Sequence, residues 1–495
     1  MPVLLHLPLD GQGPLHAQLT RALRTAMIEG RLAEGERLPA TRLLARELGL
    51  SRNTVLEAYE QLQAEGCVQA RVGAGSFVAP GVVHANAAAP AVAPGTHGAA
   101  EASPAPSAFA ERARRFHDHG AIPGRTVPGT RYAFQYGVPM ANPTLTSDWA
   151  RALSRAARRA PPAYPHVLGL PALREAICGY LSRRRGVQVA PEDVLVVNGT
   201  QQAIALAARV LVDPGAAALV EEPQYFAIRE VLQIHGAALR SAPVDAAGLV
   251  VDALPVPAPR LLCVTPSHQF PTGALMSLER RRQLLDFARR HGSWIFEDDY
   301  DGEFRYDARP LAALRSLDRD DRVIYVGSFS KLMFPALRLG YLVMPRALAR
   351  DFANAKWADD FGSPAIEQWA LADFIADGGF ERHLRRTAKA LRQRRDALLA
   401  ALHRRLGGRL EIADSNAGMH LVAWLRDADH AGCQALIDHA ARRGLGLHPI
   451  APFYLAPPPR PGLLMGFAGM PLKDIAPAVA LLGQCMDEML PAPPG

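Results

Sequence analysis

Apolar residues recur at helical spacing through the first 65 residues of the chain and predict three helices. The first covers 16–29, the second runs from Thr41 to the residue before Gly49, and the third covers 52–65. Ser51 directly precedes the third helix, where its hydroxyl can cap the first turn. The helices are short and closely spaced, so we expect one compact unit.

A period of two replaces the helical period over 67–78, with a Gly-Ala-Gly turn near its centre, and predicts two strands and a tight turn. Two short helices joined by a brief turn and followed by a hairpin form the layout of a winged helix-turn-helix, whose second helix enters the major groove of DNA. Any small domain of three helices and a hairpin would show the same pattern, so the pattern alone leaves DNA binding open. The side chains that this layout directs at DNA are Ser51, Arg52, Asn53 and Thr54, with Arg71 on the wing.

Residues 14–78 closely resemble the winged-helix domain of GntR-type bacterial regulators along its whole length. They share its LP-x-x-R, LG-x-SR-x-TV and G-x-G-x-FV motifs. Leu56 stands where some members of the family carry a further base-contacting arginine, so the base sequence that this chain reads is expected to differ. The resemblance implies that five residues touch DNA: Arg42, Ser51, Arg52, Asn53 and Thr54.

The segment after the hairpin is rich in Ala and Pro, and over 80–108 its only charged side chain is Glu101. We expect a linker over 80–125, between a DNA-binding unit at 1–79 and a second unit at 126–495. An alanine-rich helix is the alternative interpretation, and the repeated prolines argue against it.

Beyond residue 130, short apolar runs alternate with helical stretches such as 201–211 and 278–291. This alternation predicts an α/β fold with a parallel sheet covered by helices on both faces. In such sheets functional groups gather at the carboxyl ends of the strands. The predicted strands are Val194–Val197, Ala217–Val220, Leu261–Val264, Trp294–Phe296 and Val323–Val326.

Composition limits what the chain can be. Hydrophobic residues make up 49% and charged residues 21% of its 495 residues, which excludes wholesale disorder. No apolar run approaches the ~18 residues that cross a bilayer, so no membrane partner is expected. The five cysteines lie far apart and never form CxxC, which argues against a disulfide framework and a zinc site. We therefore expect a cytoplasmic protein.

The net charge is +7, yet residues 1–79 are neutral overall, so the positive surplus lies further along the chain. Two basic stretches, 151–159 and 382–395, would either extend a DNA footprint or form ordinary solvated helix faces. The solvated face is the favoured interpretation, because charged helix faces are common on protein surfaces.

Three motifs follow predicted strands, and each has a functional and an ordinary interpretation. Residues 198–200 (Asn-Gly-Thr) open a helix and would bind an anion or simply cap that helix. The acids at 297–299 would hold a metal ion or oppose a cationic ring nitrogen. Lys331 follows the last strand and would form a Schiff base with a carbonyl cofactor, or be one more surface lysine.

Together these motifs fit pyridoxal phosphate, which needs a lysine for its aldehyde, an anion pocket for its phosphate and a carboxylate for its pyridinium nitrogen. Residues from about 130 to 490 resemble fold-type I aminotransferases. The resemblance implies Lys331 as the catalytic residue that bonds the cofactor, Asp298 at the pyridine nitrogen and Tyr300 at the phenolic oxygen. It also implies that Tyr225 stacks on the cofactor ring. The residues that it implies around the phosphate are Gly199, Thr200, Ser328, Ser330 and Arg338.

A second copy of the chain is also implied, because Tyr164 lies where this fold lends a tyrosine to the phosphate of the partner subunit. We therefore expect a homodimer whose cofactor sites are shared.

Two positions depart from an ordinary aminotransferase. Phe270 stands where an Asn normally steadies the cofactor oxygen, which leaves His268 or Gln269 as substitutes. Leu464 stands where an Arg normally grips the α-carboxylate of an amino acid, and an aliphatic chain cannot replace a bidentate guanidinium. Arg460 lies close in sequence and is the alternative ligand for that carboxylate.

A winged helix, a linker and an aminotransferase-like domain, in that order, resemble the plan of the MocR subfamily of GntR regulators. The stretches TPSHQFPTG and EDDYDGEFRY are typical of it. The resemblance implies a regulator that binds promoter DNA and senses pyridoxal phosphate, or an amine or amino-acid effector, through Lys331. The alternatives are an active aminotransferase that carries a DNA-binding module, and a large domain that only holds two copies together.

Overall fold

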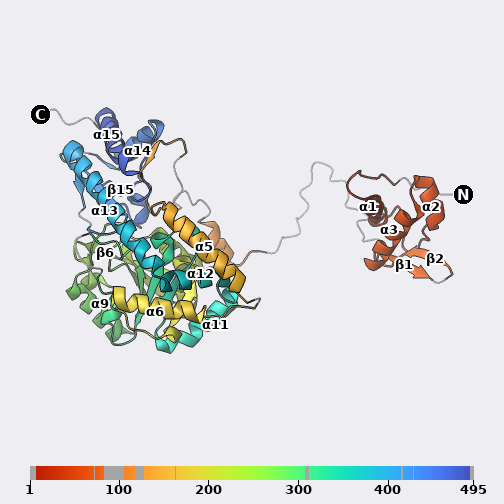
Figure 1. Cartoon of the computed structure of the whole chain (residues 1–495), viewed down its shortest axis with the longest axis horizontal. Coiled ribbons are helices and arrows are strands. Elements are labelled where there is room, and N and C mark those ends of the chain that lie inside the picture. Colours follow the sequence, from red (N-terminus) through yellow and green to blue (C-terminus); the bar gives the residue numbers. More distant parts are fainter. Residues whose placement is uncertain are drawn as a thin grey trace. The chain divides into compact units, whose positions relative to one another are not determined.

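The computed structural model describes eight stretches of the chain: 7–71, 73–82, 105–116, 128–161, 163–306, 311–413, 416–426 and 428–490. They fall into two compact units, Met1–Ala105 and Pro106–Gly495, each of which is described by itself (Figure 1). No helix of the described stretches is long and apolar enough to cross a membrane.

The first unit is a winged helix-turn-helix, as the sequence predicts. Gly49 ends the second helix with a left-handed φ of 67°, which makes the sharp turn into the third. Leu23 and Leu62 are fully buried in the core that the helices share. The elements are α1 (Leu15–Ile28), α2 (Thr41–Leu48), α3 (Arg52–Ala64) and the hairpin β1 (Val68–Arg71) and β2 (Gly75–Val78).

A helix within the expected linker corrects the prediction for 80–125. Residues of α4 (Ala108–Arg114) pack against α8 (Phe226–His235), and the Arg112 guanidinium donates a hydrogen bond of 2.7 Å to the carbonyl oxygen of Ile234. The side chain of Ser107 caps α4, a local signal that the Ala/Pro-rich composition obscured. The remaining predicted linker residues, 83–104 and 117–125, lie outside the described residues.

One eight-stranded sheet forms the centre of the second unit. Its strands are β4 (Val194–Val197), β5 (Ala217–Glu222), β6 (Ala238–Asp245), β7 (Gly248–Leu249), β8 (Leu261–Val264), β9 (Trp294–Asp299), β10 (Val323–Ser328) and β11 (Gly340–Val343). They lie in the order β4-β11-β10-β9-β8-β5-β6-β7. Neighbouring strands are parallel except at β11 and β7, which run antiparallel to their neighbours. The predicted α/β fold with a mainly parallel sheet is confirmed.

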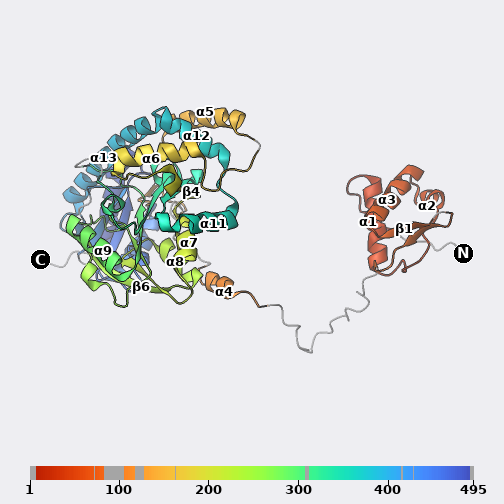
Figure 2. The ribbon, with the colours of Figure 1, turned by 90° about the horizontal axis from the view of Figure 1, so that it is seen from below.

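Helices cover both faces of this sheet, because alternate strand residues point to opposite sides. In β4, Leu195 joins the core formed with α7 (Thr200–Leu211), whereas Val194 joins the core formed with α6 (Pro171–Arg185). In β9, Ile295 packs in the core of α9 (Leu278–His291), and in Figure 2 the label of β4 lies between that of α6 and that of α7. The other long helices are α5 (Pro143–Arg159), α11 (Ala349–Asp360), α12 (Ala365–Ala376), α13 (Gly379–Leu406), α14 (His430–Arg442) and α15 (Leu472–Met489).

A smaller antiparallel sheet follows in the C-terminal part, with the order β12-β13-β15. It consists of β12 (Leu410–Ile412), β13 (His420–Leu425) and β15 (Gly462–Gly466). A further pair, β3 (Tyr132–Ala133) with β14 (Leu445–Gly446), attaches the segment near residue 130 to this part. That pairing carries the residues after β3 toward the carboxyl ends of the central sheet.

Candidate cofactor pocket and DNA-binding surface

Lys331 lies one turn beyond β10, in the short helix α10 (Phe329–Leu332). Its Nζ donates a hydrogen bond of 2.6 Å to the carbonyl oxygen of Gly137, which follows β3. Burial lowers the pKa of Lys331 to about 8, and the charges of Asp301 and Asp298 oppose this shift. An amine that is half neutral near pH 8 is a better nucleophile than an exposed lysine, as a covalent role requires.

The three acids at the end of β9 lie in different environments. Glu297 accepts backbone hydrogen bonds of 2.7 and 2.8 Å from residues 314 and 315. Asp299 forms an ion pair with the fully buried Arg185. Asp298 lies between them in the strand and therefore points to the other side of the sheet. Within the described stretches its Oδ1 has no hydrogen-bond partner, although the residue is only 5% exposed.

This arrangement bears on the two interpretations of the acids. Burial raises the pKa of Asp298 to about 8, with a further contribution from the charge of Asp299. A buried carboxylate without a partner is costly, and a cationic ring nitrogen would remove that cost. Among the described residues, no group of three or more His, Cys, Asp and Glu side chains could hold a metal ion. The geometry therefore favours a counter-charge for Asp298.

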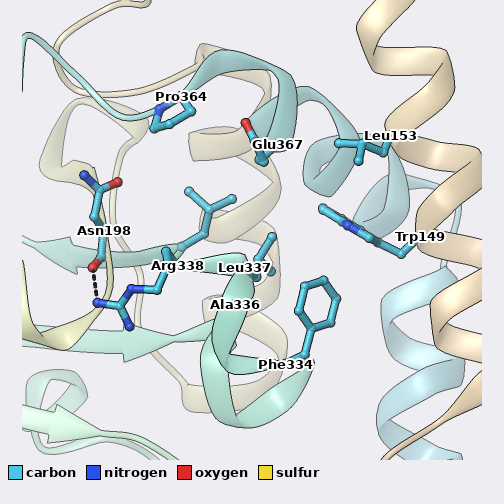
Figure 3. Close-up of a pocket in the computed structure, with 10 residues that line it drawn as sticks. Trp149, Leu153, Asn198, Phe334, Ala336, Leu337, Arg338, Pro364 and Glu367 are labelled. Atoms are coloured by element: carbon cyan, nitrogen blue, oxygen red, sulfur yellow. Dashed lines mark hydrogen bonds between the residues drawn. The ribbon is translucent and has the colours of Figure 1, made fainter.

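The predicted phosphate residues gather where β10, β11 and α7 meet. Gly199 has φ +82°, and a Cβ added there would lie 3.2 Å from Nη2 of Arg338. Arg338 donates a hydrogen bond of 2.9 Å to the carbonyl oxygen of Asn198, beside a pocket bounded by α5 and α12 (Figure 3). Ser328 pairs with Gly340 of β11, and a Cβ on Gly340 would lie 3.2 Å from Cα of Gly199.

Hydroxyl groups complete this anion-binding geometry. Thr200 is the first residue of α7, so its backbone N–H belongs to the unpaired first turn of a helix. Ser328 accepts a hydrogen bond of 3.2 Å from the backbone N–H of Ser330. The Oγ of Ser330 is buried and has no partner among the described residues. These hydroxyls, the helix N-terminus and a guanidinium are the groups that bind a phosphate.

Aromatic rings surround the position of Asp298. Tyr225 is the N-cap residue of α8, and its ring centroid lies 5.7 Å from that of Phe270. Burial and the charge of Asp298 raise the pKa of Tyr225 to about 12. Phe270 also packs 5.8 Å from the ring of Tyr300. The structure thus brings Tyr225 and Tyr300 together on either side of Phe270, which supplies no polar atom.

His268 is the polar residue that the loop after β8 places beside Tyr300. Its Nδ1 lies 2.9 Å from the hydroxyl oxygen of Tyr300 and 2.9 Å from Oδ1 of Asp301. His268 and Asp301 are 3% and 0% exposed. Gly418 makes room for them, because an added Cβ there would lie 2.0 Å from Cε1 of His268. Sequence reasoning missed Asp301 and Gly418, which carry no local signal of this role.

Of the two substitutes expected for the missing Asn, only His268 reaches Tyr300. Gln269 instead links two loops, because its Nε2 donates hydrogen bonds of 2.7 Å to the carbonyl oxygens of Pro223 and Phe270. Its Oε1 accepts hydrogen bonds of 3.1 and 2.7 Å from the backbone and hydroxyl of Thr272.

The position that normally grips an α-carboxylate is apolar. Leu464 is fully buried in a cluster that includes Phe270. Arg460 does not replace the missing guanidinium, because it forms two hydrogen bonds of 2.8 and 2.7 Å with Glu411 and stacks 4.7 Å over Trp424. This pairing with Glu411 does not support the alternative role of Arg460 as a carboxylate ligand.

Tyr164 differs from the other predicted cofactor residues because it is 87% exposed. Its ring contacts Phe361 at a centroid distance of 5.8 Å, and Trp357 packs 4.8 Å from Phe361 on the same surface. Phe361 and Trp357 are also about half exposed. Large exposed aromatic rings of this kind are typical of protein interfaces.

The first unit presents its predicted DNA contacts to solvent. Ser51 caps α3 by accepting a hydrogen bond of 3.1 Å from the backbone N–H of Thr54, and the two hydroxyls lie 2.8 Å apart. Both hydroxyls therefore orient the helix start, whereas Arg52 and Asn53 are exposed and have no such partner among the described residues. Leu56 is 40% exposed on the same helix.

The other two predicted contacts lie on neighbouring elements. Arg42 is exposed on the first turn of α2. Arg71 is exposed at the end of β1, with its guanidinium 4.7 Å from the ring centroid of Phe77 on the other strand of the wing. Stacking on Phe77 holds this charge at the edge of the hairpin.

Comparison with known families divides the chain in the same way. Residues 15–78 match the bacterial regulatory proteins of the gntR family, and residues 136–479 match aminotransferase class I and II. The probable rhizopine catabolism regulatory protein MocR of Rhizobium meliloti is 39% identical, over 95% of this chain and 94% of its own. The HTH-type pyridoxine biosynthesis transcriptional regulator PdxR of Corynebacterium glutamicum is 32% identical, over 91% of each chain.

Solved structures resemble the second unit. A kynurenine aminotransferase of Pyrococcus horikoshii, in complex with PMP, is 25% identical with a TM-score of 0.68, over 77% of this chain and 98% of its own. LysN, the α-aminoadipate aminotransferase of Thermus thermophilus, is 27% identical with a TM-score of 0.67, over 78% of this chain and 97% of its own.

Proposed function

The chain belongs to the MocR subfamily of GntR-type transcriptional regulators, and we propose that it binds promoter DNA through its first unit and pyridoxal phosphate through its second. The signal is the cofactor itself, or a small amine or amino acid that reacts with it. The output is a change in DNA affinity. The observation that carries the proposal is the buried Oδ1 of Asp298, which has no partner among the described residues, near the low-pKa amine of Lys331.

The residues present fit pyridoxal phosphate. Asp298 and Ser330 each bury a polar atom without a partner among the described residues, one at the predicted ring end and one at the predicted phosphate end. The absence of a side chain at Gly199 leaves a cradle next to Arg338. Each of these features is unfavourable or unused without a ligand, and together they correspond to two parts of the same cofactor, its ring nitrogen and its phosphate.

When bound, pyridoxal phosphate supplies an aldehyde that condenses reversibly with primary amines. Lys331 is the amine that holds it, and the carbonyl of Gly137 accepts the hydrogen bond that orients Nζ. Asp298 would keep the ring nitrogen protonated, and Tyr225 would cover the ring. Tyr300, whose hydroxyl contacts His268, would donate a hydrogen bond to the ring oxygen.

The phosphate end would be held by five residues that offer backbone N–H groups, hydroxyls or a guanidinium. A partner subunit would add the hydroxyl of Tyr164, whose exposure in one chain fits this role. The protein would then be a homodimer of the cytoplasm with two shared sites. The five residues are Gly199, Thr200, Ser328, Ser330 and Arg338.

Contacts to DNA come from the start of α3, from α2 and from the wing. Arg52 and Asn53 are free to read base edges, because the hydroxyls of Ser51 and Thr54 are engaged in the helix cap. Arg42 and Arg71 would hold phosphates on either side. The DNA in these contacts would be a promoter duplex. The exposed Leu56 would influence which base sequence the protein reads.

Turnover of standard α-amino acids is not part of the proposal. Leu464 cannot bind an α-carboxylate, and the guanidinium of Arg460 is held by Glu411. An amine would therefore bind without a bidentate arginine on its carboxylate, and its affinity would be lower. We propose that binding of the amine, and not its turnover, is the signal.

Adding pyridoxal phosphate to the purified full-length protein, and then removing the unbound cofactor, tests the cofactor part of this proposal. The wild type should acquire visible absorbance that borohydride removes, and Lys331→Ala should acquire none. Lys473→Ala is the matched control, because that lysine is exposed on the first turn of α15. A wild type that remains colourless with excess cofactor would contradict the proposal.

A further inference from the structure

The helix α13 presents a continuous row of cationic side chains to solvent, which we call the α13 stripe. Arg382, Arg385, Arg386, Lys389 and Arg392 are all exposed. Their spacing of three or four residues places them on one face of the helix, opposite the face that is buried in the core. At 1.5 Å per residue the stripe is ~15 Å long.

The charges of the stripe are not neutralised by the protein. Arg385, Arg386, Lys389 and Arg392 form neither an ion pair nor a side-chain hydrogen bond with any described residue. Arg382 donates only to the backbone carbonyl of Asp377, at 3.0 Å.

The acids closest to the stripe in sequence form their ion pairs with residues outside it, although the charges of Glu381 and Arg385 also attract one another. Glu381 pairs with Arg184 of α6, and Asp396 lies 3.4 Å from the guanidinium of Arg395. The stripe thus keeps a surplus of positive charge that its own surroundings do not offset.

The other basic stretch of the second unit behaves differently. On α5, three of the arginines bind acids: Arg151 pairs with Asp148, Arg155 with Asp377 and Arg159 with Asp373. That helix is an ordinary solvated face with balanced charges. The contrast separates two stretches that look equally basic in the sequence.

A row of unpaired cations attracts a polyanion, and duplex DNA is the polyanion that a GntR-type first unit brings to this chain. A length of ~15 Å corresponds to about four or five base pairs along a duplex.

We infer that the α13 stripe binds the phosphate backbone of the DNA that flanks the site read by α3. The inference rests on the proposed function, because the first unit must deliver the duplex. Contacts to phosphates carry no base information, so the stripe adds affinity and footprint without changing the sequence that is read.

The salt dependence of DNA binding by the full-length protein tests this inference. The variant Arg385→Gln/Lys389→Gln/Arg392→Gln is compared with the wild type on a mixed-sequence duplex. The control variant Arg282→Gln/Arg289→Gln/Arg290→Gln loses the same net charge from exposed positions on α9, where Asp286 pairs with two of them. Each phosphate contact contributes about 0.9 to the slope of log K against log salt.

We expect the slope of the stripe variant to be shallower than that of the wild type by about two to three, and that of the control to be unchanged. Single variants Arg385→Gln and Lys389→Gln should each reduce the slope by about one. They keep the test valid if the triple variant misfolds. Equal slopes for stripe variant and wild type would overturn the inference. Altered transcription with unchanged slopes would assign the stripe to an acidic protein and overturn it too.

The failure of the proposed function would be visible separately. A wild type that binds no DNA at any salt concentration would contradict the role of the first unit. A wild type that binds DNA through Arg52, with a stripe that makes no difference, would contradict only the inference about α13.

Discussion

The imidazole Nδ1 of His268 lies 2.9 Å from the hydroxyl oxygen of Tyr300. This contact joins the loop after β8 to the end of β9, and Oδ1 of Asp301 lies 2.9 Å from the same Nδ1. Phe270 offers no polar atom at the place of the usual Asn. We therefore propose that the His268 contact orients the Tyr300 hydroxyl toward the cofactor oxygen.

Gly418→Ala should disturb this contact without changing any polar group. The added Cβ would lie 2.0 Å from Cε1 of His268, at a backbone φ of +77° that disfavours a side chain. We expect about tenfold weaker binding of pyridoxal phosphate and a shift in the pH at which the visible absorbance changes. Gly408→Ala is the control, since nothing lies within 4 Å of its added Cβ. An unchanged absorbance titration in Gly418→Ala would count against the role of His268.

Asp298→Asn and Asp299→Asn should separate cofactor binding from folding. Asp298→Asn removes the proposed partner of the ring nitrogen and should cost about 2–5 kcal/mol of cofactor affinity with little loss of stability. Asp299→Asn leaves the fully buried Arg185 without its anion and should destabilise the protein by about 3–5 kcal/mol. Cofactor titration and equilibrium unfolding of the cofactor-free protein measure both. A loss of stability in Asp298→Asn, together with a loss of cofactor affinity in Asp299→Asn, would contradict the roles inferred from the geometry of β9.

The attachment of pyridoxal phosphate should depend on pH through Lys331. Only the neutral amine attacks an aldehyde, and burial lowers the pKa of Lys331 to about 8. The attachment rate should therefore rise with pH up to about 8 and then level off, whereas an ordinary lysine would continue to gain up to about 10.4. Stopped-flow absorbance at several pH values measures this. A rate that still rises tenfold per pH unit above 9 would contradict a lowered pKa.

Part of this architecture follows from the sequence. The apolar runs at 194–197 and 261–264 are strands with the predicted bounds, and 278–291 is a helix as predicted. The strands predicted to end at Val220 and Phe296 continue into the polar residues that follow, because hydropathy does not register a buried acid at a strand end. The pattern therefore finds the apolar centre of a strand but not its functional tip.

Contacts between distant segments could not be read from the pattern. Asp299 and Arg185 are more than 100 residues apart, and Gly418 meets His268 only because β13 approaches the loop after β8. The charge balance of a helix could not be predicted from the sequence for the same reason. Whether an arginine is neutralised depends on acids that other helices supply, as for Arg159 and Asp373.

Arg52→Ala should weaken binding of DNA by about 1–3 kcal/mol if the guanidinium reads a base. If it touches only a phosphate, affinity should fall similarly on all sequences, and the salt slope should be shallower by about one. Arg31→Ala is the control, because Arg31 pairs with Glu29 in the turn after α1. Binding by Arg52→Ala that equals the wild type, on a duplex selected from a random-sequence pool, would remove α3 as the reading helix.

Occupancy of the Lys331 site should change the affinity of the protein for DNA. An effector can shift DNA binding only by its different affinity for two arrangements of the protein, and such coupling is typically about 5–150-fold. The decisive measurement is the dissociation constant for the selected duplex, with and without pyridoxal phosphate, for wild type and Lys331→Ala. The wild type should change its affinity, and Lys331→Ala should keep folding and non-specific DNA binding but show no change. An equal response in both proteins would contradict the claim that the covalent site is the switch.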